Sequence, residues 1–186
     1  RECAPGDTAE LDALLAQLQP KKSPSGFVHA SVGIYPSRRL VRRHTVEPKR
    51  MKEPAYLVEI CTQQFHIDQD KYALAILDAT DGTDIDLVKG TQKDAVFCGL
   101  PMDDAIETQT SLLERGIYPE RLELGSIATI GGVASCLATM KVKTPVLVLE
   151  IGADATHSYI VTANGLEASR SFAQGLDAMV PIVQKE

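Results

Sequence analysis

A short segment of small and polar residues, 150–156, has the composition of a phosphate-binding turn. It follows an apolar run and has the sequence Glu-Ile-Gly-Ala-Asp-Ala-Thr. A glycine in a tight turn lets an anion approach backbone N–H groups, and a threonine hydroxyl can provide a further donor. The candidate cofactor-binding residues are therefore Glu150, Gly152, Asp154 and Thr156. The alternative is a simple β-hairpin in which Gly152 only satisfies the geometry of the turn.

A second candidate site is a strongly basic segment. Residues 21–52 contain nine basic residues and one acidic residue, Glu47, although the whole chain has a net charge of −6. A one-sided potential of this kind attracts an acidic protein, an anionic lipid surface or nucleic acid. The alternative is a solvated hairpin edge that blunts unwanted strand pairing. Nucleic acid is the least favoured partner because few aromatic residues are available for stacking. The candidate partner-binding residues are Arg38, Arg39, Arg42 and Arg43.

Composition places the chain among ordinary globular proteins. Its 186 residues are 44% hydrophobic and 24% charged, which suits one domain or two small lobes. No apolar run reaches the ~18–20 residues of a membrane helix. The four cysteines form no CxxC pair and the four histidines share no metal-ligand spacing. We therefore expect free thiols, a reducing cytoplasmic location and no zinc site.

The hydrophobic pattern predicts alternating helices and strands. The run 146–152 should be the strongest strand, buried on both faces of a central sheet. Asn164-Gly165 favours a type I′ hairpin, and Gly131-Gly132 would permit close helix packing. Ile106, Leu112 and Leu113 should face inward. The predicted helices are 8–19, 53–66, 101–116, 126–138 and 176–183, and the predicted strands are 27–34, 37–46, 72–78, 94–100, 121–124, 146–152, 156–162 and 166–172.

The order of short motifs resembles that of the PilM family of actin-like proteins, which assemble the inner-membrane platform of type IV pili. The cytoplasmic domain of the secretion protein GspL and the cell-division protein FtsA are more distant relatives. A basic segment ends in proline at residues 42–48, and residues 114–119 match E-x-G-[IL]-x-P. Residues 150–156 resemble D-I-G-x-x-x-T, and residues 169–175 resemble S-R-x-I-x-x-G-G. The order and spacing agree over most of the chain.

The resemblance implies an α/β chain with a partial actin-like fold of the ASKHA, ribonuclease H-like type and a small inserted α+β subdomain. Residues 1–37 and 91–143 would form the first lobe, 38–90 the inserted subdomain, and 144–186 the start of the second lobe. The implied function is a non-catalytic scaffold at the cytoplasmic face of a pilus or type II secretion platform. The implied partner is a short peptide of a membrane protein, expected first at residues 38–52 and at strand edges.

Departures from the family motifs bear on catalysis. Glu150 stands where the family has Asp, and its longer side chain would misplace a water bridging to a metal. The first phosphate loop and the adenosine-binding Gly-Gly turn have no counterpart, so the chain resembles the middle of the fold. We therefore expect no catalytic residue and no metal ligand in this chain. ATP and magnesium would be cofactors of the complete protein only.

Other functions stay open at this stage. One is a nucleotide-dependent kinase or ATPase of the hexokinase-actin superfamily, whose catalytic carboxylate would come from Asp78, Asp81, Asp84 or Asp154. These acids are more simply explained as solvated turn residues. Another is an interaction module unrelated to actin. Unpaired strand edges also predict a homodimer.

Overall fold

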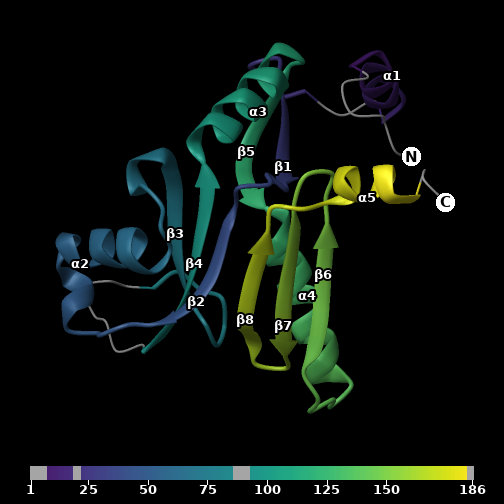
Figure 1. The fold of residues 1–186 in the computed structure, drawn as a ribbon. Helices are drawn as coiled ribbons and strands as arrows, with labels where there is room; N and C mark the ends of the chain where they lie inside the picture. Colours follow the sequence, from purple (N-terminus) through teal and green to yellow (C-terminus); the bar gives the residue numbers. More distant parts are fainter. Residues whose placement is uncertain (1–7, 19–21, 86–92, 184–186) are drawn as a thin grey trace. The chain divides into compact units, whose positions relative to one another are not determined.

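The computed structural model describes residues 8–18, 22–85 and 93–183 (Figure 1). The chain divides into two compact units. Unit 1 consists of residues 1–33 and 103–123, and unit 2 of residues 34–102 and 124–186. Both functional candidates, the segment around residue 150 and the arginines near residue 40, fall in unit 2.

The described residues of unit 1 form two helices and a two-stranded sheet, β1–β5. Exposure alternates residue by residue along β1, as its period-two pattern predicts. Two expectations were wrong. β5 begins at Ile117 and not at Arg121, and the Ile106 side chain is exposed, because it lies on the outer side of its helix. The elements are α1 (Thr8–Leu18), β1 (Val28–Ile34), α3 (Met102–Glu114) and β5 (Ile117–Leu124).

The first sheet of unit 2 has the order β2-β4-β3, with both pairs antiparallel. A helical segment covers it, starting with Pro at the first helical position and ending in a π-helical turn. Short 3-10 turns lie at Arg50–Lys52 (η1) and Gln69–Lys71 (η3). The strands are β2 (Leu40–Thr45), β3 (Tyr72–Asp78) and β4 (Asp94–Pro101), and the helical segment is α2 (Pro54–Glu59) with η2 (Ile60–Gln64).

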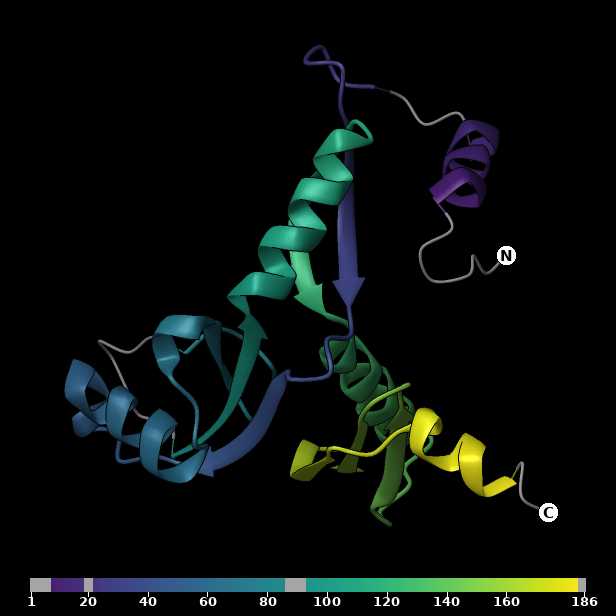
Figure 2. The same ribbon diagram turned by 45° about the horizontal axis from the view of Figure 1, so that its top comes forward.

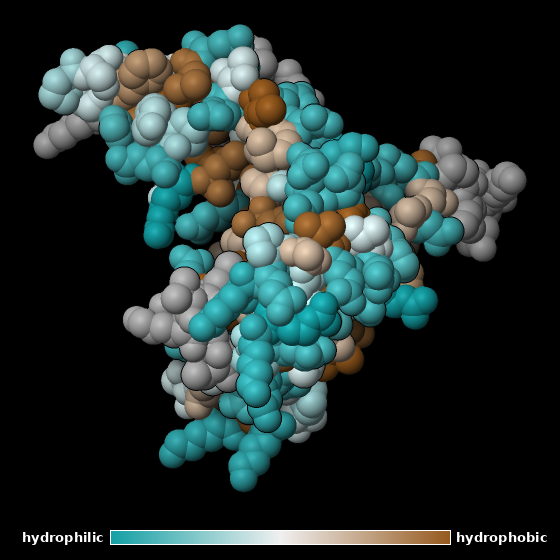
Figure 3. Space-filling view, turned by 90° about the vertical axis from the view of Figure 1, so that its left-hand side faces the viewer, coloured by the Kyte–Doolittle hydropathy of each residue, from teal (hydrophilic) through white to brown (hydrophobic). Residues whose placement is uncertain are grey.

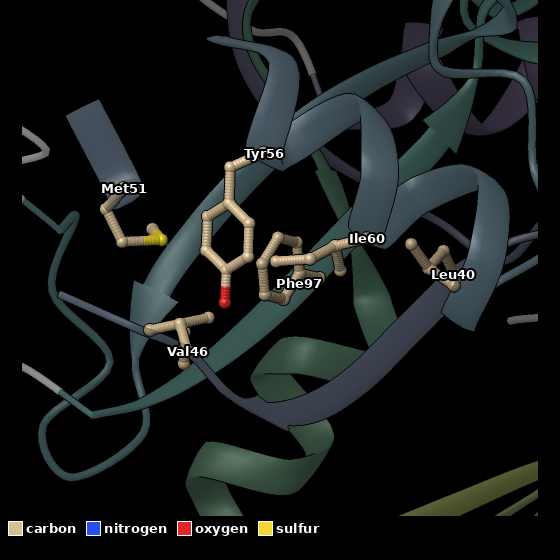
Figure 4. Packing of buried hydrophobic residues seen from close by; sticks show 7 residues of the cluster. Leu40, Val46, Met51, Tyr56, Ile60 and Phe97 are labelled. Carbon is tan, nitrogen blue, oxygen red and sulfur yellow. The ribbon is translucent and has the colours of Figure 1, made fainter. Parts of the chain in front are cut away.

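A compact apolar core lies between this sheet and α2 (Figure 4). Phe97, in the middle of β4, is 1% exposed and meets the ring of Phe65 with centroids 5.1 Å apart. The Tyr56 hydroxyl accepts a hydrogen bond from the backbone N–H of Glu47, which satisfies the polar end of a buried ring. The core residues are Leu40, Val46, Met51, Tyr56, Ile60, Ala95 and Phe97.

Strand pairing shifts one expected boundary. Residues 94–101 were expected in the first lobe, outside the inserted subdomain. They form β4, the middle strand between β2 and β3, so the subdomain sheet extends past residue 90. The physical reason is burial: β4 is almost entirely buried and takes the place that has a neighbour on each side. The assignment of the other residues to lobes stays a prediction.

The second sheet of unit 2 is an antiparallel meander, β6-β7-β8. α4 packs against β7 and β8, and the two ribbon views place it on one face of this sheet (Figures 1 and 2). α5 follows β8 and begins beside the turn that joins β6 to β7. The elements are α4 (Gly125–Thr139), β6 (Val146–Ile151), β7 (Thr156–Thr162), β8 (Gly165–Phe172) and α5 (Leu176–Val183).

The structure corrects the expected burial of β6. In the described part of the chain β6 pairs with β7 alone, so it is an edge strand. Leu147 is 64% exposed, and Leu149 and Ile151 on the same face are also exposed. An unbroken apolar run hides the difference between the two faces, so period two cannot reveal which face is open. The homodimer expected at strand edges stays a prediction.

Two glycine expectations were also wrong. The β7–β8 turn consists of Ala163 and Asn164, and Gly165 is the first residue of β8 with φ +106°. The only positive φ of this hairpin lies at glycine, so the turn is not type I′, which needs positive φ at both central residues. A Cβ added at Gly131 or Gly132 would meet no atom within 4 Å, so neither glycine mediates close helix packing.

Candidate functional site

A largely buried carboxylate, Glu150, is the centre of a polar network within unit 2. Its Oε2 accepts hydrogen bonds from Arg39 Nη2 at 2.7 Å and from Ser126 Oγ at 2.6 Å. The Tyr159 hydroxyl donates to the same oxygen at 3.2 Å. These four residues, which we call the Glu150 network, come from β6, the approach to β2, the first turn of α4, and β7.

The strand register explains how Tyr159 reaches Glu150. Side chains alternate along a strand, and Glu150 lies on the less exposed face of β6. Glu150 pairs with His157 on β7, so Tyr159, two residues further, is its diagonal neighbour on the same face. Tyr159 is 1% exposed, and burial raises the pKa of its phenol. The phenol therefore stays protonated, and its O–H donates a hydrogen bond to the carboxylate.

Arg39 is held by backbone carbonyls as well as by the carboxylate. Its Nη1 donates to the Pro36 carbonyl at 2.9 Å, and the side chain is 5% exposed, against 14% for Glu150. Two buried atoms of the pair, Arg39 Nε and Glu150 Oε1, have no hydrogen-bond partner among the described residues. An ion pair this well buried has lost most of its hydration, so its geometry is tightly constrained.

Two groups expected to hold a phosphate, on Gly152 and Thr156, form hydrogen bonds within the chain. The Gly152 N–H donates to the Ala155 carbonyl at 2.8 Å, which closes the turn. The Thr156 hydroxyl donates to the Gln174 carbonyl at 2.8 Å. Asp154 is exposed on the turn and lies outside the Glu150 network. The hairpin alternative therefore describes the geometry of residues 152–156, and their role in binding a cofactor stays a prediction.

The same turn carries the beginning of α5. The backbone N–H of Leu176 donates to the Gly152 carbonyl and that of Asp177 to the Ala153 carbonyl, each at 2.9 Å. The two elements approach so closely that a Cβ on Gly175 would lie 2.4 Å from both carbonyl oxygens. The first amides of α5 thus bind the turn, where they satisfy donors that a helix N-terminus leaves open.

The arginines of β2 contact the β6–β7–β8 sheet within unit 2. Arg42 Nη1 donates to Ser169 Oγ at 3.2 Å. Arg43 forms ion pairs with Glu167 at 2.7 Å and with Asp94 at 3.3 Å. Arg38 is exposed at the surface. Arg39, Arg42 and Arg43 therefore form hydrogen bonds or ion pairs inside unit 2.

His157 joins this arrangement as a buried neutral imidazole. Its Nε2 lies 3.0 Å from the Ser37 carbonyl, which can only accept, so Nε2 carries the proton. Nδ1 then accepts from the Ser171 hydroxyl at 3.0 Å. Burial, followed by the charge of Arg39, lowers the pKa of His157 below its usual value.

His157 gives the protein a predictable pH dependence. Because its pKa is lower in the folded than in the unfolded state, the unfolded state binds more protons below pH ~6.5. Its stabilising contribution is complete above that pH and is lost as the pH falls toward the folded-state pKa. We expect urea titrations between pH 7 and pH 5 to show a steeper loss of stability for the native protein than for His157→Gln. Equal slopes for the two proteins would contradict a lowered pKa for His157 in the folded state.

Two other acidic candidates, Asp78 and Asp81, form hydrogen bonds within a turn. Asp78 accepts a hydrogen bond from the Thr80 N–H, and bonds from Thr83 lower the pKa of Asp81, so both carboxylates stabilise the turn after β3. The same turn, α4 and the β7–β8 turn line a cleft of about 260 Å³.

Burial raises the pKa of Cys98 to about 12, which keeps this thiol unreactive. No group of three metal-ligating side chains occurs within the described residues.

Sequence reasoning missed the partners of Glu150. Ser126 and Tyr159 were not among the candidates, and His157 was expected to be a surface or hydrogen-bonded core histidine and not a metal ligand. A β-hairpin was the alternative considered for this segment, and the register of β6 with β7 in such a hairpin places Tyr159 beside Glu150. Nothing in the spacing connects Arg39 to Glu150, which is 111 residues away.

The elements of the chain form part of an actin-like fold of the α/β class, as expected. A solved structure described as "PilM-PilN type IV pilus biogenesis complex" matches 95% of this chain with a TM-score of 0.68 and 18% sequence identity. The match covers 51% of that chain, so this chain spans about half its length. No family model matches the sequence, and no curated protein matches it. Among the described helices, none combines the length and apolar character needed to cross a membrane.

Proposed function

We propose that the chain is part of a non-catalytic actin-like scaffold that binds a membrane-protein partner at the cytoplasmic face of a type IV pilus or type II secretion platform. The observation that supports the proposal most directly is the likeness of its fold to a chain of the PilM-PilN complex. The structural match extends over 95% of the chain. The order of the short sequence motifs is a second line of support. The partner would be a short peptide from a protein anchored in the inner membrane.

The basic segment remains the first surface on which we place this partner. Arg39, Arg42 and Arg43 are engaged within unit 2, so their charge is partly neutralised there. Arg38 is exposed and lies in the turn that precedes β2. Figure 3, viewed from the side of α2, shows that hydrophilic side chains predominate in this view, with hydrophobic ones between them.

Binding of a peptide tests this function. The complete gene product is titrated by calorimetry with the cytoplasmic N-terminal peptide of the PilN-like protein from the same source. We expect saturable binding, weakened by about 5- to 10-fold in Arg38→Glu, because a reversed charge at an interface raises the dissociation constant.

Two controls accompany the titration. Lys71→Glu makes the same charge reversal at a side chain that is 78% exposed and lies on η3, so it should bind as the native protein does. A scrambled peptide should give no heat of binding. Absence of binding by the native sequence peptide contradicts the scaffold proposal, and equal losses in both variants contradict the assigned surface.

The kinase or ATPase alternative gains no support from the site geometry. Its candidate groups Glu150, Gly152 and Thr156 all have hydrogen-bond partners within the chain. Turnover of ATP with a small hydroxyl substrate by the complete protein would revive it.

A further inference from the structure

We propose that Arg39 is the built-in counter-ion of Glu150, and that this buried ion pair takes the place of the divalent cation that the resemblance of residues 150–156 implies. The pair joins the approach to β2 with β6, and so connects the two sheets of unit 2. The inference concerns the phosphate-loop carboxylate and does not depend on which partner the protein binds.

The hydrogen bonds of Glu150 leave little room for a metal. Oε2 accepts three of them, from Arg39, Ser126 and Tyr159, at 2.6–3.2 Å. A carboxylate oxygen offers two lone pairs, so this oxygen has no capacity left for a cation. Magnesium also demands near-octahedral oxygen ligands and retains several waters, whereas the Arg39 guanidinium beside this oxygen carries only N–H donors.

Charge argues in the same direction. The guanidinium nitrogen of Arg39 lies 2.7 Å from Oε2, and the Arg39 side chain is 5% exposed. A dication bound by the same carboxylate would face this positive charge at close range, where burial weakens screening. The group fits an arginine and does not fit magnesium.

The two unpaired atoms of the network support the same assignment. Glu150 Oε1 could be read as an open metal ligand, because it is buried and lacks a hydrogen-bond partner. The other unpaired atom is Arg39 Nε, which belongs to the guanidinium of the same ion pair. One bridging water, or a small rotation to the two-pronged geometry that guanidinium and carboxylate favour, satisfies both. A metal on Oε1 would leave the Nε donor unsatisfied.

Thermal unfolding of the complete protein tests the proposal. Arg39→Met leaves a buried carboxylate without its counter-ion, and we expect its Tm to fall by about 10 °C. Glu150→Gln should lower Tm similarly, and the double variant should lose clearly less than the two single losses together. Any rise in Tm that Mg²⁺ with ATP produces should be the same in the native protein and in Glu150→Gln. The reason is that the nucleotide does not use this carboxylate.

Two further variants keep the experiment decisive. Arg121→Met removes an arginine that is 72% exposed and should shift Tm by less than about 2 °C. If Arg39→Met does not fold, Arg39→Lys replaces it in the comparison with Glu150→Gln and the double variant. Lysine keeps the positive charge, so its fall in Tm should be smaller. Additive losses, or a Mg²⁺–ATP stabilisation that Glu150→Gln abolishes, would overturn the proposal. Failure of the peptide titration would affect only the scaffold function.

Discussion

Phe97→Ala is expected to lower the free energy of unfolding by about 3–5 kcal/mol, the range for truncating a buried aromatic side chain. Phe97 is 1% exposed, lies on the middle strand β4, and packs edge-on against Phe65 and His44. Truncation to alanine removes the ring that contacts Phe65 and His44, and it leaves a cavity beneath α2. Urea denaturation followed by circular dichroism measures the change.

A matched control is available on the other sheet. Phe172 ends β8, is 43% exposed, and has Arg170 over its ring at 5.2 Å. Truncating it should cost less than about 1 kcal/mol, because an exposed ring loses little burial and a weak cation–π contact. Equal losses for Phe97→Ala and Phe172→Ala would contradict the position of the core under α2.

Elements whose two faces differ could be predicted from the sequence. Periodicity located β1, where alternate residues are sheltered, and β3, and turn residues marked the end of α3 at Gly116, which has φ +73°. The length of a uniform apolar run was also visible. Its environment was not: β4 and β6 are both apolar, yet one is central and the other is an edge. Only tertiary pairing separates these two outcomes.

The candidate site shows a similar division. The sequence located Glu150 and the turn that follows it, because a glycine between two strands leaves a local signal. It could not show that Arg39 would meet Glu150, since an ion pair between distant segments depends on how the two sheets pack. It also treated the arginines of β2 as a surface, whereas Arg42 and Arg43 both bond to β8, and Arg43 also pairs with Asp94 at the start of β4.

Gly175→Ala should be the most damaging small substitution near the site, with an expected loss of at least about 1–3 kcal/mol. The added Cβ would lie 2.4 Å from the carbonyl oxygens of Gly152 and Ala153. Both are backbone atoms, so the clash can be relieved only by moving the turn away from α5. That movement breaks the hydrogen bonds from Leu176 and Asp177. Urea denaturation measures the loss, and hydrogen exchange of these two amides should become faster.

Gly131→Ala provides the opposite control for this prediction. Gly131 lies inside α4, and an added Cβ there meets no atom within 4 Å. Alanine in a helix interior is favoured over glycine by about 0.5–1 kcal/mol, so this variant should be more stable than the native protein. The same methyl group then has opposite effects at two glycines of one unit, because only Gly175 faces backbone atoms. Stability changes of the same sign in both variants would contradict the close contact between the turn and α5.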